Sequence, residues 1–412
     1  SFRSNMNRDV SCTKKKKKLI CTACGSTLSR RGNLSRCQKC REQVEIEEFI
    51  SKNIDTEERS DIFKRYKSFF PFQSSCSGLS LGEGMTPLLS APSFAEKYGV
   101  KEIFLKNETV NPTWSFKDRG TAASIHHAIE LGFRRIGTVS TGNMAASVAA
   151  FGARAGLETT ILVKGYIPSE KLNPVAIYNA RLIKALGDYD RLYEESLRLG
   201  ERYGIYFMNS DVPFRVEGSK TIAFEICEQT EFNVPDFVII PTSAGGNIRG
   251  IEKGFREFYK SGLIPHIPTI VAAQAEGCAP IARAYEKNSL TIERFPNPHT
   301  VAHAIENPFP PSGNQVLRML HRQRGVAVAV SEESIYESQL ELAGMGLFVQ
   351  PASAVSLAAL KKLRQTGSIS SEQRAACILT GSGLKYTAVF DAYNLNAEEC
   401  LIDDLEKLLA VK

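Results

Sequence analysis

The stretch Asp236-Phe237-Val238-Ile239-Ile240-Pro241 leads directly into Thr242-Ser243-Ala244-Gly245-Gly246-Asn247-Ile248-Arg249-Gly250. Its first part is a short apolar run rich in β-branched residues, which predicts a strand buried on both faces. Its second part is a glycine-rich turn opening a helix, where paired glycines let the backbone approach a phosphate and the helix offers its N–H groups. The turn matches neither the nucleotide-hydrolase motif nor a dinucleotide fingerprint. We expect a phosphate site here, and an ordinary tight turn is the alternative.

Strand-like and helix-like segments alternate along the chain before this stretch. We expect strands at 103–106, 135–140 and 160–163, and helices over 144–155, up to about residue 185 and up to about residue 203. Repeated strand–helix units predict parallel sheets with helices on both faces. Ligands on such sheets bind beyond the carboxyl ends of the strands.

Two further strand-to-turn junctions carry polar groups. Ser140-Thr141-Gly142-Asn143-Met144 follows one predicted strand and opens a helix, where hydroxyl and backbone N–H groups suit a carboxylate. Cys377-Ile378-Leu379 is followed by Thr380-Gly381-Ser382-Gly383-Leu384, which again puts hydroxyls just past a strand. A hydroxyl there is suited to hydrogen-bond a heterocyclic nitrogen.

The segment Asn111-Pro112-Thr113-Trp114-Ser115-Phe116-Lys117-Asp118-Arg119-Gly120 places one lysine between aromatic residues, just before a predicted helix. Burial beside apolar groups lowers the pKa of a lysine, which suits it to form a Schiff base with an aldehyde. The alternative is a structural lysine at a helix start, paired with Asp118. The residues of this segment leave both interpretations open.

Four cysteines near the N-terminus form two CxxC pairs, Cys21 with Cys24 and Cys37 with Cys40. Two such knuckles supply a tetrahedral set of four thiolates, which predicts a structural zinc ribbon with no open coordination position. A nucleic-acid-binding ribbon is the alternative, although no other part of the chain is typical of a nucleic-acid reader. Residues from about 44 to 70 are amphipathic and predict one or two helices ending at Pro71.

The composition is that of an ordinary globular chain, with 412 residues, 43% of them hydrophobic and 23% charged. The net charge of +6 owes five positive charges to the run Lys14 to Lys18, in an expected disordered tail. No apolar run approaches the roughly 20 residues of a membrane span. We therefore expect a basic tail over 1–18, a zinc ribbon over 19–45, a helical linker over 46–80 and a catalytic region over 81–412, with a smaller α/β subdomain at about 130–215. No secretory signal is seen, and six scattered cysteines fit the reducing cytoplasm.

The lysine, the anion turn, the glycine-rich turn and the late hydroxyl together resemble the pyridoxal-phosphate enzymes of the tryptophan-synthase-β type. Within that group the chain is similar to threonine synthases that carry an N-terminal zinc ribbon. The matches extend over roughly residues 80 to 390. They include Leu81 to Leu88, Pro112 to Gly120, Ser140 to Asn143, Ala153 to Leu157, Val216 to Ala223, the turn at Gly245, Phe348 to Ala354, and Leu379 to Lys385.

The resemblance implies an α/β chain of fold type II with two domains, parallel sheets flanked by helices, and the zinc ribbon in front. It assigns Lys117 as the Schiff-base lysine and proton shuttle, and Thr380 to the pyridine nitrogen. It implies that the cofactor is further held by Phe116, Asn143, Gly245, Gly246, Asn247 and Ile248. It implies that the substrate carboxylate meets Ser140, Thr141, Gly142 and the backbone of Met144. Lys171, Arg154 and Lys220 are the cations we expect near a substrate phosphate.

The expected reaction is conversion of O-phospho-L-homoserine and water to L-threonine and phosphate, in a cytoplasmic homodimer with no nucleic-acid partner. Four departures from the family pattern face the substrate side: Trp114 for glycine, Met144 for threonine, Gln350 for glutamate and Tyr386 for aspartate. The stretch Ile167 to Pro174 also differs. If Trp114 and Met144 narrow the pocket, a cysteate synthase, which replaces the phosphate of O-phospho-L-serine by sulfite, is the alternative. A threonine or serine dehydratase fits the lysine segment less well.

Overall fold

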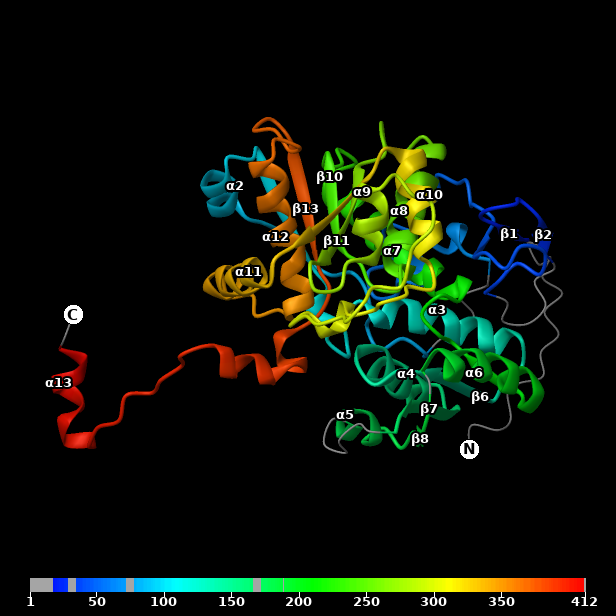
Figure 1. Ribbon diagram of the computed structural model, residues 1–412, viewed down its shortest axis with the longest axis horizontal. Coiled ribbons are helices and arrows are strands. Elements are labelled where there is room, and N and C mark those ends of the chain that lie inside the picture. The colour runs from blue at the N-terminus through cyan, green and yellow to red at the C-terminus, as the bar shows by residue number, and fades with distance from the viewer. Residues whose placement is uncertain (1–17, 29–34, 72–77, 166–171, 188, 411–412) are drawn as a thin grey trace.

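The computed structural model describes residues 18–28, 35–71, 78–165, 172–187 and 189–410 (Figure 1). The expected basic tail lies outside this range except for Lys18. A six-stranded sheet forms the larger body, in the order β12-β11-β10-β13-β5-β4. All its neighbours are parallel except the pair β4 and β5. Its strands are β4 (Leu88–Ser90), β5 (Glu102–Asn107), β10 (Phe237–Pro241), β11 (Thr269–Ala275), β12 (Val326–Val330) and β13 (Arg374–Leu379).

Strand β10 is buried along its whole length, as its apolar run predicted. Val238 and Ile240 belong to the buried cluster on one face, and Phe237 and Ile239 belong to the cluster on the other. The first face is covered by α7 (Pro213–Gln229), α8 (Gly246–Lys260), α9 (Pro280–Glu286) and α10 (Gly313–Gln323). The second is covered by α2 (Pro92–Tyr98), α11 (Glu332–Gly344) and α12 (Pro351–Gln365). The chain is thus an α/β protein with helices on both faces of a parallel sheet.

A second sheet of four parallel strands lies between residues 135 and 207, in the order β8-β7-β6-β9. Its strands are β6 (Arg135–Val139), β7 (Glu158–Lys164), β8 (Arg181–Ala185) and β9 (Ile205–Phe207), with α4 (Asn143–Arg154), α5 (Asn173–Ala176) and α6 (Tyr189–Tyr203). The predicted helix up to residue 185 is wrong at its end. Residues 181–185 pair with β7 over five register positions instead, since pairing with an existing sheet overrides local helix propensity.

The N-terminal module is a three-stranded antiparallel sheet of β1 (Leu19–Cys21), β2 (Thr27–Leu28) and β3 (Val44–Ile46). The prediction of one or two helices over 44–70 is wrong for most of that range. Only α1 (Ile62–Arg65) and the 3-10 turn η1 (Lys67–Phe69) are helical. The backbone before them bonds to α8 and the residue after it: Phe49 N–H donates to Glu257 (3.1 Å) and Ser51 N–H to Ser261 (3.1 Å). Because these groups find partners on the body, a helix is not needed to satisfy them.

Helix α3 (Lys117–Glu130) lies between the two sheets and is anchored by buried charges. The Arg119 guanidinium donates to Glu108 (2.7 Å) and Glu225 (2.5 Å), and all three side chains are buried. Helix α7 packs closely against α3 at Gly218, where a Cβ would lie 2.2 Å from the Arg119 carbonyl oxygen. These contacts fix the first turn of α3, which begins at the lysine singled out above.

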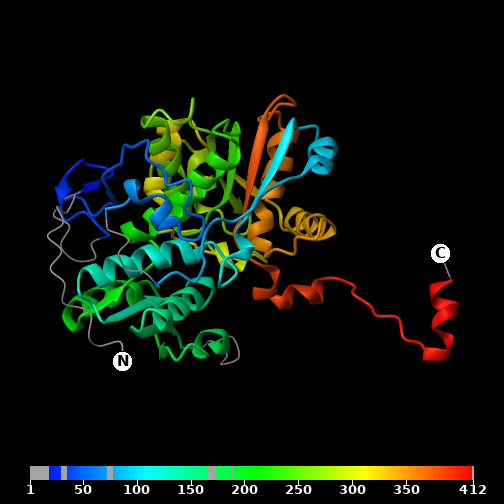
Figure 2. The same ribbon diagram turned by 180° about the vertical axis from the view of Figure 1, so that it is seen from behind.

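The C-terminal segment leaves the body after the 3-10 turns η5 (Gly383–Lys385) and η6 (Thr387–Ala392). Figure 2 shows residues 393–410 running away from both sheets and ending in η7 (Ile402–Asp404) and α13 (Leu405–Leu409). Leu401, Ile402 and Leu409 are among its exposed apolar side chains. No helix in the described ranges is both long and apolar enough to cross a membrane.

Candidate active site

The loop before α3 is joined to the turn after β13 by backbone hydrogen bonds. Phe116 N–H donates to the Thr380 carbonyl (3.0 Å), and Ser382 N–H donates to the Trp114 carbonyl (2.9 Å). Strands β5 and β13 are neighbours in the larger sheet, so the segments that follow them meet at one edge. Two stretches that are more than 260 residues apart in sequence are therefore brought together around Lys117.

The surroundings of Lys117 favour the neutral amine over the charged ammonium. Burial, together with the nearby Arg215 guanidinium, lowers the pKa of its ammonium to about 7. Its Nζ lies 4.7 Å from the centroid of the Phe116 ring. The neighbouring Asp118 carboxylate instead accepts from the Thr113 N–H (2.7 Å) and hydroxyl (2.5 Å). The alternative in which Lys117 pairs with Asp118 is not what the structure has.

This pKa predicts the pH dependence of Lys117 reactivity in the cofactor-free protein. Because a lowered lysine pKa leaves the amine neutral above about pH 7, labelling by an amine-reactive reagent should rise with pH and level off just above 7. An ordinary lysine would continue to gain reactivity up to about pH 10. Peptide mass spectrometry measures the labelling of Lys117. A midpoint near 10 for Lys117 would contradict the burial assigned to it.

A cavity of about 670 Å³, counted with its opening to solvent, surrounds this lysine. Its lining includes the loop 242–248, parts of α3, α4 and α7, Ala304 and Ile305 of the 3-10 turn η4 (His303–Ile305), Gln350 and Thr380. Among the described residues of the lining, Lys117 is the one lysine and Arg215 is the one arginine. The described lining contains no histidine, cysteine, tyrosine or carboxylate. Lys117 is therefore the sole side chain of the described lining that can act as a base near neutral pH.

The turn that opens α8 forms a cradle of backbone groups. Gly245 has φ +97°, and a Cβ on it would lie 2.8 Å from the Ser312 Cβ. A Cβ on Gly246 would lie 2.5 Å from the Ser210 carbonyl oxygen. Asn247 is 9% exposed, and neither atom of its side-chain amide has a hydrogen-bond partner among the described residues. Open N–H groups at a helix start, beside an amide that lacks partners, fit a phosphate.

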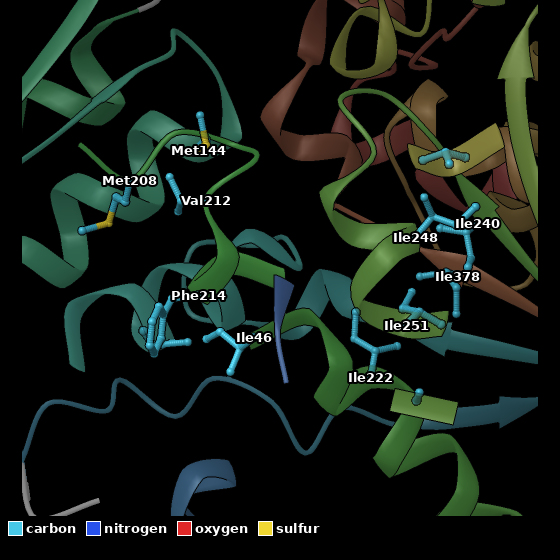
Figure 3. Packing of buried hydrophobic residues seen from close by; sticks show 14 of the residues in the cluster. Ile46, Met144, Met208, Val212, Phe214, Ile222, Ile240, Ile248, Ile251 and Ile378 are labelled. Atoms are coloured by element: carbon cyan, nitrogen blue, oxygen red, sulfur yellow. The ribbon is translucent and has the colours of Figure 1, made fainter. Parts of the chain in front are cut away.

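The remaining predicted cofactor residues lie around the same cavity. The Asn143 amide exchanges hydrogen bonds with the Gln350 amide, at 2.9 Å and 3.3 Å, which holds both in the wall. The Thr380 hydroxyl lies 2.8 Å from the Ser353 hydroxyl. Ile248 is different, because its side chain belongs to the buried cluster (Figure 3) and only its backbone faces the cradle. A ring bearing a phosphate, a hydroxyl and a nitrogen fits this set of partners.

The turn from Ser140 to Gly142 precedes α4, and its residues are at least partly accessible. Met144 is buried, and it belongs to the same apolar cluster as Met208 and Val212 (Figure 3). Trp114 is 49% exposed. Neither Met144 nor Trp114 is part of the cavity lining. The expectation that these two large side chains narrow the pocket is wrong, because one packs into the core and the other faces solvent.

Trp114 has φ +65°, a left-handed conformation that glycine adopts at no steric cost. We expect Trp114→Gly to stabilise the protein by about 1 kcal/mol, and Trp114→Val to destabilise it, because left-handed backbone costs an L-residue about 1–2 kcal/mol. Thermal unfolding of the three proteins, followed by circular dichroism, should give midpoints in the order Gly, Trp, Val. A lower midpoint for the glycine variant would show that the indole makes a stabilising contact that outweighs the strain.

The three cations expected near a substrate phosphate do not gather in the cavity. Arg154 is exposed at the last turn of α4, the end opposite to Asn143. Lys220 is buried in ion pairs with Glu217 (2.5 Å) and Glu257 (3.1 Å), so its charge is already paired. Lys171 lies outside the described residues, as does most of the divergent stretch 167–174.

Besides Lys117, the cationic side chain that lines the described cavity is Arg215, which the sequence analysis did not single out. Its guanidinium is buried, donates to the Thr121 hydroxyl (3.0 Å) and the Lys117 carbonyl (3.3 Å), and forms no ion pair within the described chain. Ser219, one helical turn further along α7, lines the cavity beside it. Residues four apart share a helix face, so Arg215 and Ser219 point to the cavity together, while Lys220 lies on another face of α7.

The four cysteines predicted to bind metal lie together. Their Sγ atoms are all within 4.8 Å of one another, with Cys21 and Cys40 3.4 Å apart and Cys24 and Cys37 3.8 Å apart. Zn–S bonds of about 2.3 Å in a tetrahedron require S···S distances of roughly 3.8 Å. Backbone N–H groups of Ala23, Cys24 and Lys39 point at cysteine sulfurs, each at 3.4 Å. The arrangement fits a zinc knuckle pair.

Comparison with known proteins places this geometry in a family. The family model for the pyridoxal-phosphate dependent enzymes matches residues 79–381. The threonine synthase of Methanocaldococcus jannaschii is 39% identical over 375 residues, which cover 85% of this chain and 93% of that protein. The threonine synthase of Methanosarcina acetivorans is 36% identical, over 89% of this chain and 92% of that protein.

Solved structures agree on the fold. Maize serine racemase superposes with a TM-score of 0.63 at 22% identity, over 74% of this chain and 91% of that one. The processed form of threonine deaminase isoform 2 from Solanum lycopersicum gives 0.61 at 20% identity, over 79% of this chain and 82% of that one. These likenesses concern the fold and not the substrate. The chain belongs to the pyridoxal-phosphate-dependent enzymes of fold type II, in the family of the threonine synthases.

Proposed function

We propose that this enzyme converts O-phospho-L-homoserine and water to L-threonine and phosphate. The observation that carries the proposal is a cavity with one base among its described residues, Lys117, and two separate phosphate-binding features. The glycine cradle at 245–248 suits the phosphate of the cofactor. The Arg215 guanidinium, which pairs with no carboxylate of the described chain, suits a second phosphate, that of the substrate. The 36–39% identity to threonine synthases over most of the chain supports the same reaction.

Roles follow for several polar residues that line the cavity and for the turn from Ser140 to Gly142, which is not part of the lining but leads into Asn143. The cofactor phosphate is held by the N–H groups of 245–248 and the Asn247 amide, and the ring contacts Asn143 and Thr380. Gln350 positions Asn143 through their paired amides. The turn at Ser140 to Gly142, with the N–H groups that open α4, holds the substrate carboxylate. The Arg215 guanidinium and Ser210 hold the substrate phosphate.

Pyridoxal phosphate, when bound, withdraws electrons from the substrate carbons next to the amine. Lys117 Nζ would move the protons: it takes one from the α-carbon and one from the β-carbon of the substrate, and returns one to the γ-carbon and one to the α-carbon, while the hydroxyl adds to the β-carbon. A pKa near 7 suits both directions of transfer, since the amine is neutral about half the time at neutral pH. The C–O bond to phosphate breaks, and Arg215 stabilises the departing dianion. Water then supplies the hydroxyl of threonine.

The alternative of a cysteate synthase loses one of its supports, a pocket narrowed by Trp114 and Met144, because neither lines the cavity. Its other support, the divergent stretch 167–174, lies mostly outside the described residues. The departure at Gln350 does lie in the wall, where an amide in place of a carboxylate lets it both donate to and accept from Asn143. The replacement of glutamate by Gln350 therefore affects Asn143, a predicted cofactor contact, and does not favour phosphoserine as the substrate.

We further propose a homodimer, one structural zinc per chain and a cytoplasmic location. Exposed leucines on the extended C-terminal segment support burial against a second copy. The grouped sulfurs of the four cysteines support zinc. The free cysteines of the described chain support a reducing compartment.

The test is to supply O-phospho-L-homoserine to the purified protein in ¹⁸O-water. We expect equal amounts of threonine and phosphate, with the label in the threonine hydroxyl, because the C–O bond breaks and water adds to carbon. A phosphatase breaks the P–O bond and puts the label into phosphate instead. Label confined to phosphate, or no release with cofactor bound, would refute the proposal.

A further inference from the structure

We propose that the N-terminal metal ribbon stabilises the loop that binds the cofactor phosphate, residues 245–248. Gln43 of the ribbon is the positioning residue, because it holds the segments that pack against this loop. Loss of the metal or of the Gln43 amide then weakens cofactor binding, although neither touches the cofactor. The inference rests on the cofactor site of the family and not on the identity of the substrate.

On the ribbon side, both metal knuckles hold Gln43. The Gln43 carbonyl accepts from the N–H (3.0 Å) and the hydroxyl (2.9 Å) of Thr22, the residue after the ligand Cys21. On its other side Gln43 bridges to Arg36, the residue before the ligand Cys37. Closing the four sulfurs around a metal therefore fixes the backbone of Gln43 between the two knuckles.

On the body side, the Gln43 side chain is fully buried and all of its amide is used. Its Nε2 donates to the Asp211 carboxylate (3.1 Å) and the Pro311 carbonyl (2.7 Å), and its Oε1 accepts from Arg249 (3.3 Å). Arg36 adds a second bond to the Pro311 carbonyl (2.9 Å). One amide thus ties together three segments of the catalytic body.

Two of those segments press directly on the cradle. Asp211 follows Ser210, whose carbonyl oxygen lies 2.5 Å from where a Cβ of Gly246 would be. Pro311 precedes Ser312, whose Cβ backs Gly245 and whose N–H donates to the Ala244 carbonyl (3.0 Å). Gly245 and Gly246 therefore pack against Ser312 and Ser210. These two serines are the sequence neighbours of Pro311 and Asp211, which Gln43 binds.

The third segment closes the arrangement through α8 itself. Arg249, in the first turn of α8, donates to the Ser312 hydroxyl (3.1 Å) as well as to Gln43 (3.3 Å) and to the Val44 carbonyl (3.1 Å). Residues 44–46 of the ribbon bond along α8 to Arg249, Lys253 and Arg256, and Figures 1 and 2 show the ribbon on the side of the body where α8 and α10 lie. The ribbon, the cradle helix and the loop before α10 form one hydrogen-bonded unit.

The metal is the part of this unit that can be removed. A module of three short strands has little core, so its fold depends on the metal. Without it, Gln43 is no longer fixed, and the fully buried Asp211 carboxylate loses an amide partner. By linkage the coupling is reciprocal: bound cofactor also tightens the hold on zinc.

The experiment uses the full-length, zinc-loaded protein and titrates pyridoxal phosphate into the cofactor-free form, following its visible absorption. Zinc content is measured on the same samples, and circular dichroism monitors folding. We expect Gln43→Ala to retain one zinc and bind the cofactor about tenfold more weakly. We expect Arg36→Met, which removes the second bond to Pro311, to weaken binding about two- to threefold. The ³¹P resonance of the bound cofactor phosphate should shift in Gln43→Ala.

The matched control is Arg318→Ala. It removes an ion pair between α10 and Glu42 of the ribbon (2.9 Å) at the rim of the same interface, without touching Asp211 or Pro311. We expect its cofactor affinity to stay within about twofold. Unchanged affinity and an unchanged ³¹P resonance in both Gln43→Ala and Arg36→Met would overturn the inference, as would full affinity in zinc-free protein. No substrate is used, so this outcome is separate from failure of the proposed reaction.

Discussion

Lys117→Ala is expected to lower kcat by about 10⁴-fold or more while leaving the fold intact. The described cavity lining holds no other group that can take a proton near neutral pH, because its remaining polar residues are serines, threonines, amides and one arginine. Truncation also removes the amine that the family uses to hold its cofactor covalently. Turnover, the visible absorption of the purified protein, and mass spectrometry after borohydride reduction measure the three consequences.

Lys385→Met is the matched control for this prediction. Lys385 is a second buried lysine, and burial lowers its pKa to about 8, but it donates to the Thr113 carbonyl (2.5 Å) and is not part of the lining. We expect the Lys385→Met variant to retain covalently bound cofactor. Small primary amines added to Lys117→Ala should restore part of the turnover, since they replace the missing base. Retention of full activity by Lys117→Ala would refute the assignment.

Arg215→Ala is expected to lower kcat/KM for the phosphorylated substrate by about 10²-fold. A buried guanidinium that forms no ion pair with any described residue is available for a phosphate, and two charge-assisted hydrogen bonds at about 1.5 kcal/mol each account for that loss. A second readout is independent of turnover. Because the positive charge of Arg215 contributes to the lowered pKa of Lys117, removing it should move the labelling midpoint of Lys117 upward.

The control is Arg154→Ala, which removes an arginine that sequence reasoning also proposed but that is exposed at the far end of α4. We expect kcat/KM to change by less than about twofold. Arg215→Lys should recover part of the loss, because it restores the charge without the planar fork. An unchanged kcat/KM together with an unchanged Lys117 midpoint would contradict a phosphate-binding role.

The predictions that succeeded depended on local signals. The all-apolar run of β10 predicted a strand buried on both faces. Of the paired glycines after it, Gly245 has a positive φ, and both are approached too closely for a side chain. The order of Lys117, Asn143, Gly245 and Thr380 along the chain implied that they converge, and all four line one cavity.

The predictions that failed depended on contacts between distant residues. The amphipathic stretch before α1 forms no long helix, and Glu257 and Ser261 accept hydrogen bonds from two of its backbone N–H groups, those of Phe49 and Ser51. Met144 faces the core and not the substrate, since the register of α4 sets its direction. Lys220 was proposed near the substrate phosphate and Arg215 was not considered, because only the packing of α7 shows that Glu217 and Glu257 already pair with Lys220.

The most direct test of the central claim is a comparison of two substrates. Purified, cofactor-loaded protein is given O-phospho-L-homoserine in one assay and O-phospho-L-serine with sulfite in another, and phosphate release is measured in both. The arrangement of Lys117 and Arg215 in one cavity, together with the kinship to threonine synthases, predicts a kcat/KM at least about 10²-fold higher for phosphohomoserine. Faster, sulfite-dependent release from phosphoserine would contradict it.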